Sequence, residues 1–237
     1  VLGSRGLGDV YKRQLGELFN LERILGFCEK FLYFLKINCL FLLSNLPVLL
    51  FFLFVGISQV RIYLPLFLLC LIPAGPAVSA VFFSMNRMLR GTETGAWKDY
   101  KTGYQDTWGL KCLLAVIQCL LIWMFWTNVE FFSVQIPFLP LTVLFFLLFA
   151  GVVLMTPNLY LLASRYQMRV QDYFRGAAIL LVTKPVLTIG NLAVAAFILM
   201  LLEIRAGTVV LFMASIYGFL VVFMNRNVMQ ALDNSTK

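Results

Sequence analysis

The sequence predicts an all-α fold, a polytopic transmembrane helical bundle of about six spans with short interfacial helices and both ends in the cytoplasm. Three observations predict it: the composition, the length of the apolar runs, and the placement of basic residues. Of the 237 residues, 61% are apolar and 13% are charged. A soluble domain has roughly 45–50% apolar and about 25% charged residues. A chain this apolar cannot cover its surface with polar groups, so part of its solvent must be lipid.

Six apolar runs are long enough to cross a bilayer, because each helical residue adds about 1.5 Å and the hydrocarbon core is about 30 Å thick. The predicted spans are Ile37–Ile57, Ile62–Phe83, Gly109–Asn128, Pro137–Tyr160, Val186–Glu203 and Thr208–Met224. Together they make one bundle over residues 37–228, followed by a cytoplasmic tail over residues 229–237. The fifth run is short and the least secure, so five spans is the alternative count.

Basic residues are distributed unequally between the two sides of this six-span layout. Fourteen lie on the side of the N-terminus: Arg23, Lys30, Lys36, Arg87, Arg90, Lys98, Lys101, Lys111, Arg165, Arg169, Arg175, Lys184, Arg226 and Lys237. The opposite side has only Arg61 and Arg205. Cytoplasmic loops carry the excess of Lys and Arg, so the split predicts that both ends are cytoplasmic. It favours six spans over five, because losing one span would mix the two sets.

The first residues differ abruptly from the rest. Ser4–Gln14 match, residue for residue, one reading frame of a transposase-based DNA sequencing adapter. Our hypothesis is that residues 1–14 are a translated artefact, and they are excluded from reasoning about the fold.

Amphipathic stretches flank the predicted spans. Residues 15–36 are predicted to form an interfacial helix, because apolar residues recur at helical spacing with Glu22, Glu29 and Lys30 between them. Tyr166–Ala178 has a similar pattern. An aromatic stripe with lysines interleaved is a candidate interfacial or partner-contact surface. Its members are Trp97, Tyr100, Tyr104 and Trp108.

Proline and small residues interrupt several spans. Pro73 and Pro76 each remove a backbone donor, and Gly75 and Ser79 form a small-xxx-small pair that permits close helix approach. Pro47 and Pro157 are similar candidates for helix breaks. A packing kink is the favoured interpretation. The alternative is a broken helix whose free backbone groups bind an ion or a substrate.

The sequence has few groups that carry chemistry. It has no histidine, and no Asp, Glu, Lys or Arg lies in the middle of a predicted span. It has no Walker A, GxSxG or HExxH motif. We therefore predict a non-enzymatic protein with no catalytic, cofactor-binding or metal-binding residues, no cofactor and no nucleic-acid partner. The intramembrane amides are interpreted as helix–helix contacts, with a substrate path as the alternative: Asn38, Asn45, Gln118, Asn158 and Asn191.

Several short motifs resemble the YesL-like family of bacterial integral membrane proteins of unknown function. They are Leu46-Pro47, Gly75-Pro76-Ala77, the loop Leu89–Gly95, the aromatic helix Trp97–Trp108, and Thr156-Pro157 through Arg165. The resemblance covers most of Asn38–Asn227. The chain departs from the family in the long apolar insert between Pro47 and Gly75. Family members are often encoded near sugar-uptake ABC transporter genes.

Three functions are consistent with these patterns. The resemblance implies an accessory protein of a carbohydrate ABC uptake system in the bacterial cytoplasmic membrane, with the bilayer and transporter subunits as partners. A transporter or permease is the first alternative, although Gly176-Ala-Ala178 lacks the Glu and later Gly of an ABC coupling segment. The second is a membrane enzyme on lipid-linked substrates. Its only candidate group is Arg87, Asp99, Tyr100 and Asp106, which we interpret as a solvated loop face.

Overall fold

Every regular element of the part of the chain that the structure describes is helical, so the all-α prediction is confirmed. The structure is a computed structural model that describes residues 21–135 and 137–235, without the side chains of residues 21–23, 206 and 231–235. The predicted artefact at residues 1–14 lies outside the described residues. The elements are α2 (Leu21–Ser44), α3 (Leu46–Phe54), η1 (Ile57–Gln59), α4 (Leu64–Leu71), α5 (Ala74–Leu89), α6 (Ala96–Gln105), α7 (Trp108–Glu130), η2 (Phe131–Gln135), α8 (Leu139–Ala163), α9 (Val170–Thr183), α10 (Pro185–Val209) and α11 (Met213–Ser235).

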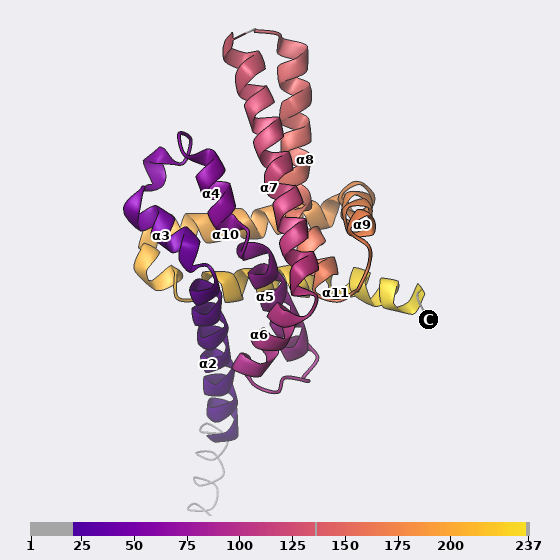
Figure 1. Cartoon of the computed structure of the whole chain (residues 1–237). Coiled ribbons are helices and arrows are strands. Elements are labelled where there is room, and N and C mark those ends of the chain that lie inside the picture. Colours follow the sequence, from indigo (N-terminus) through magenta and orange to yellow (C-terminus); the bar gives the residue numbers. More distant parts are fainter. Residues whose placement is uncertain (1–20, 136, 236–237) are drawn as a thin grey trace, which may run out of the picture.

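Four helices are long and apolar enough to cross a membrane: Leu64–Leu89, Trp108–Gln135, Leu139–Ala163 and Pro185–Arg205. They correspond to the second, third, fourth and fifth predicted spans. The fifth, which the sequence made least secure, passes on length and composition, although its helix α10 runs across α7 and α8 in Figure 1. In Figure 1, α7 and α8 stand side by side as a long hairpin, and the two helices pack against each other along their length.

The first predicted span, Ile37–Ile57, is not one straight helix. α2 runs without a break from Leu21, in the described part of the predicted interfacial helix, into the span, and it contains no proline. The chain then bends by 65° before α3. At the bend, the side chain of Asn45 donates a hydrogen bond to the backbone carbonyl of Phe41, one turn earlier in the chain (2.8 Å). Pro47 lies in the first turn of α3. Counting this bent pair as one span gives at most five.

The six-span count needs correction at the sixth predicted span, Thr208–Met224. Its helix, α11, is not among the candidate spans found in the described residues, and in Figure 1 α10 and α11 run across the α7–α8 hairpin. The turn before α11 lies against α2, since Phe31 and Phe212 have ring centroids 5.1 Å apart. The prediction had placed these two segments on opposite sides of the membrane. α11 also continues to Ser235 with Met229 buried, so the described part of the predicted tail is helical.

Contacts between loops agree with the predicted pairing of the remaining ends. Arg61 and Glu130, which belong to the two loops predicted outside the cytoplasm, form an ion pair of 2.6 Å. Asn86 and Arg165, next to loops predicted inside, are joined by a hydrogen bond of 2.9 Å. α5 lies at the centre and packs against α2, α6, α7, α8 and α11. It therefore positions Gly75, Ser79 and Arg87 against the neighbouring helices.

Candidate functional site

A buried carboxylate, Asp99, ties together three helices and a loop at one end of α5. It is 0% exposed. Its Oδ1 lies 2.9 Å from Arg87 Nη1 on α5, and its Oδ2 accepts a hydrogen bond of 3.0 Å from the Tyr33 hydroxyl on α2. Thr94, in the loop before α6, donates from both its hydroxyl (2.8 Å) and its backbone N–H (3.1 Å). These four residues are called the Asp99 cluster, and they satisfy the charge of a carboxylate that water does not reach.

This arrangement corrects one interpretation of the sequence. Asp99 and Arg87 are brought together as the enzyme alternative required, but Asp99 does not lie on a solvated face. Neighbouring Tyr100 is 5% exposed and donates a hydrogen bond of 2.9 Å to Ser44 Oγ on α2. Burial raises the pKa of the Tyr100 hydroxyl above its ordinary value. Tyr100 is thus held neutral and engaged in a helix–helix contact.

The four aromatic candidates separate into two pairs. Trp97 and Trp108 are 63% and 53% exposed. Tyr100 and Tyr104 stack with ring centroids 6.1 Å apart and contribute to the core. They do not form one stripe, because α6 ends at Gln105 and Trp108 begins α7. The two tryptophans are the members available to lipid headgroups or a partner.

Gly75, Pro76 and Ser79 are buried where α5 crosses α7 and α8. A Cβ placed on Gly75 would lie 2.8 Å from Ala115 Cβ and 3.2 Å from Lys111 O, both on α7. The Ser79 hydroxyl donates to the backbone carbonyl of Tyr160 on α8 at 3.5 Å. The segment is therefore a tight helix junction, the arrangement that the packing interpretation expects.

The other prolines lie at different kinds of position. Pro73 precedes the first residue of α5, and α4 and α5 on either side of it still make one candidate span. Pro47 follows the sharp bend after α2. Pro157 lies inside α8 without ending it. Among these prolines, Pro47 alone follows a break between two described helices that are bent by more than 40° relative to each other.

The intramembrane amides bond mostly between helices. Asn38 on α2 donates to Val210 O (2.7 Å) and accepts from Ala214 N (2.9 Å) at the turn before α11. Asn191 on α10 donates to Asn158 on α8 and accepts from Asn225 on α11, at 3.2 and 3.0 Å. Sequence reasoning missed Asn225, although its position near the end of an apolar run is the same signal that singled out the others. Such bonds join helices in place of lining a polar path.

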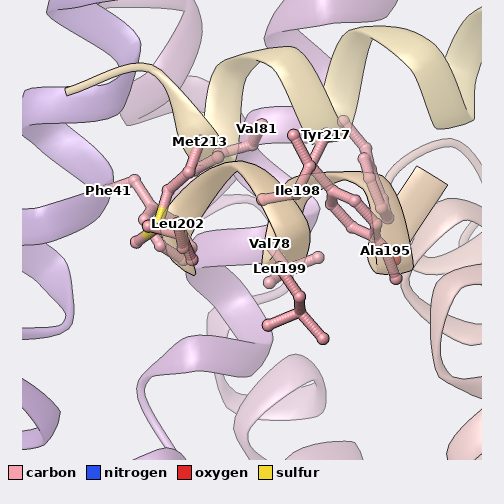
Figure 2. Close-up of a pocket in the computed structure, with 11 residues that line it drawn as sticks. Phe41, Val78, Val81, Ala195, Ile198, Leu199, Leu202, Met213 and Tyr217 are labelled. Carbon is pink, nitrogen blue, oxygen red and sulfur yellow. The ribbon is translucent and has the colours of Figure 1, made fainter. Parts of the chain in front are cut away.

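An apolar groove of about 320 Å³ lies between α2, α5, α10 and α11 (Figure 2). Ala195, Ile198, Leu199 and Leu202 line it at i, i+3, i+4 and i+7 along α10. Leu199 is 66% exposed, which places the groove at the surface. The remaining lining residues are Phe41, Val78, Val81, Phe82, Met213, Ala214 and Tyr217. No sequence pattern predicts this groove, because segments of four helices that are distant in the chain form it.

One family model matches the chain. Residues 34–129 match the family described as "Protein of unknown function, DUF624". No curated protein and no solved structure matches. The matched segment includes Gly75 and three members of the Asp99 cluster, Arg87, Thr94 and Asp99, but it begins one residue after Tyr33 and ends before α8, α10 and α11. Residues 34–129 are thus similar to the DUF624 family, which is compatible with the resemblance to YesL-like proteins.

Proposed function

We propose that this chain is a non-enzymatic protein of the bacterial cytoplasmic membrane that holds a membrane-embedded partner, and that the partner is a permease subunit of a carbohydrate ABC importer. The observation that carries the proposal is the apolar groove between α2, α5, α10 and α11. The identity of the partner comes from the family resemblance in the sequence. The groove supplies the surface on which a transmembrane helix of that partner packs.

The groove suits a helix from another protein. Its α10 side presents residues that recur every three or four positions over seven residues, about 10 Å of helix. Small Ala195 and Ala214 lie among larger side chains. Alternating small and large residues let a second helix approach closely, and close packing drives helix association where lipid is as apolar as the side chains.

The polar residues support an accessory role over the two alternatives. Asp99, Arg87 and Tyr100, the candidates for an enzyme, are engaged in contacts that hold α2, α5 and α6 together. Asn158, Asn191 and Asn225, which a solute path would need, bond to one another. Using either set for chemistry or transport requires breaking contacts that the fold employs.

The proposal is tested by filling the groove. Ala195→Trp introduces an indole where the partner helix is expected to pack. We expect it to abolish recovery of permease subunits when the tagged protein is purified from native membranes in a mild detergent. Leu144→Trp on α8 is the matched control, since it adds an indole at a position that is 49% exposed and outside the groove. The control should recover permease as wild type does.

Two results would contradict the proposal. One is recovery of permease by Ala195→Trp at the wild-type level, when both variants elute as monodisperse protein. The other is uptake of labelled sugar into liposomes that contain only this chain, which indicates a transporter in its own right.

A further inference from the structure

Three arginines line a second, polar hollow, which the proposed function does not use. Its volume is about 310 Å³. We call it the arginine hollow, and its lining residues are Phe83, Asn86, Arg87, Arg90, Thr92, Ser164 and Arg165. These lining residues supply three guanidinium groups, a side-chain amide and two hydroxyls, and no lining residue that the structure describes carries a carboxylate. The lining therefore favours a ligand that is anionic and rich in acceptor oxygens.

Neighbouring contacts hold two of the guanidinium groups in place. Arg87 donates from Nε to Thr92 O (3.1 Å) and pairs through Nη1 with Asp99 (2.9 Å). Its guanidinium carbon also lies 5.8 Å from the centre of the Phe83 ring. Arg165 donates from Nη2 to Asn86 Oδ1 at 2.9 Å. Because these contacts fix the planes of both groups, binding an anion orders less side-chain freedom than it would on flexible lysines.

The hollow lies where two candidate spans end. One span ends at Leu89 and the other at Ala163, and the lining residues lie at or next to both ends. The end of a span is the level of lipid headgroups. The basic-residue count also places this end on the cytoplasmic side, where anionic lipids attract basic segments. A headgroup and a water-soluble cytoplasmic anion can both reach such a position.

We propose that the arginine hollow is a binding site for a phosphate group, carried either by an anionic phospholipid headgroup or by free phosphate in the cytoplasm. The guanidinium groups donate charge-assisted hydrogen bonds to the phosphate oxygens from N–H groups that the contacts of Arg87 and Arg165 named above do not use. Ser164, a lining residue, is 4% exposed, and Asn86 accepts a hydrogen bond from Arg165. The site is independent of the apolar groove and of any partner there.

Two variants and one control test the site in the full chain. Arg90→Gln and Arg165→Gln each remove one lining charge, and neither touches the Arg87–Asp99 pair. Arg175→Gln on exposed α9 removes the same charge from the same predicted side, outside the hollow. In the lipid arm, protein in mixed phosphatidylcholine and phosphatidylglycerol is examined by native mass spectrometry for retained phosphatidylglycerol. In the free-phosphate arm, inorganic phosphate is titrated calorimetrically into protein in phosphatidylcholine nanodiscs.

We expect both hollow variants to weaken binding roughly tenfold in the arm where wild type binds, because each loses a charge-assisted hydrogen bond. The control should bind as wild type does. Dependence on Arg90 and Arg165 in the lipid arm alone identifies a headgroup, and dependence in the phosphate arm identifies a free anion. Arg165→Lys, which keeps the charge but loses the planar fork, should bind between wild type and Arg165→Gln. Equal binding by wild type and both hollow variants, an equal loss in Arg175→Gln, or no binding in either arm would overturn the proposal.

Discussion

Two arginine–carboxylate pairs lie at opposite ends of the molecule and differ in what surrounds them. Arg87–Asp99 joins α5 to α6, and the Asp99 side chain is 0% exposed while that of Arg87 is 26% exposed. Arg61–Glu130 joins the loop after η1 to the end of α7, and its side chains are 68% and 45% exposed. The chemistry is the same at both ends. Burial decides which pair the fold depends on. Water screens the exposed pair, whereas the buried charge is stabilised by its protein partners alone.

The surroundings extend this contrast. Asp99 also accepts from Tyr33 and from two groups of Thr94, so one carboxylate connects elements that are distant in the chain. Within the described residues the Glu130 carboxylate pairs with Arg61 alone, and the neighbouring Ser133 hydroxyl donates to the Glu130 backbone carbonyl instead. We infer that the Asp99 end is the rigid base of the bundle. The tip of the α7–α8 hairpin depends instead on apolar packing, such as the stacked rings of Phe132 and Phe145.

The largest expected effect is at Asp99. Asp99→Ala removes the acceptor of several hydrogen bonds and leaves the Arg87 charge without its buried partner. We expect a loss of about 3 kcal/mol in the free energy of unfolding, the low end for breaking a buried pair because Arg87 still reaches water. Unfolding by SDS titration of the detergent-solubilised protein measures it.

Asp99→Asn separates charge from shape at the same position. It keeps an acceptor for Tyr33 and Thr94 and loses the ion pair, so its cost should fall between wild type and Asp99→Ala. Equal stability of Asp99→Ala and wild type would show that the buried cluster does not hold α2, α5 and α6 together.

A smaller effect is expected at the Gly75 junction, which lies at the opposite end of α5 from Arg87 and the Asp99 cluster. Gly75→Ala places a methyl group 2.8 Å from Ala115 Cβ, and both α5 and α7 must shift to accept it. Overpacking of this kind costs about 1–3 kcal/mol. Gly151→Ala is the matched control in α8, since nothing lies within 4 Å of its added Cβ. The control should be unchanged or slightly more stable in the same titration, and similar losses in both variants would contradict a specific close contact at Gly75.

Local pattern was enough to predict some elements of this fold. α7 and α8 follow from two apolar runs separated by a short segment that contains Glu130, Ser133 and Gln135, and the structure has both helices close to the predicted limits. The helix–helix interpretation of the amides holds for most of them, because a polar group in a span finds a partner on a neighbouring helix, but Asn45 bonds back to Phe41. Here Asn158 and Asn191 bond as expected. Such features depend on hydropathy and on local satisfaction of polar groups.

The remaining features depend on contacts between distant residues. Nothing near Thr208–Met224 reveals that the turn before α11 packs on α2, since the bond from Asn38 to Val210 joins residues 172 positions apart. The burial of Asp99 is similar. The pattern around it marks an amphipathic segment, but only the position of α2 shows that Tyr100 faces inward and Trp97 outward. The groove and the arginine hollow likewise exist only after helices distant in the chain have packed.

The smallest expected effect on stability is at the exposed Arg61–Glu130 pair. Glu130→Gln should change the free energy of unfolding by about 0–1 kcal/mol, because two exposed side chains lose entropy on pairing and their attraction is screened. When the titration is repeated at low and high salt, even this difference should shrink at high salt, because the screening length falls from about 10 Å at 0.1 M to about 3 Å at 1 M. Asp99→Ala should keep its deficit in both salts, because its charge partner is buried. A salt-resistant loss in Glu130→Gln would instead mean that the tip of the α7–α8 hairpin is covered in the membrane-embedded protein, and that burial does not distinguish the two ends.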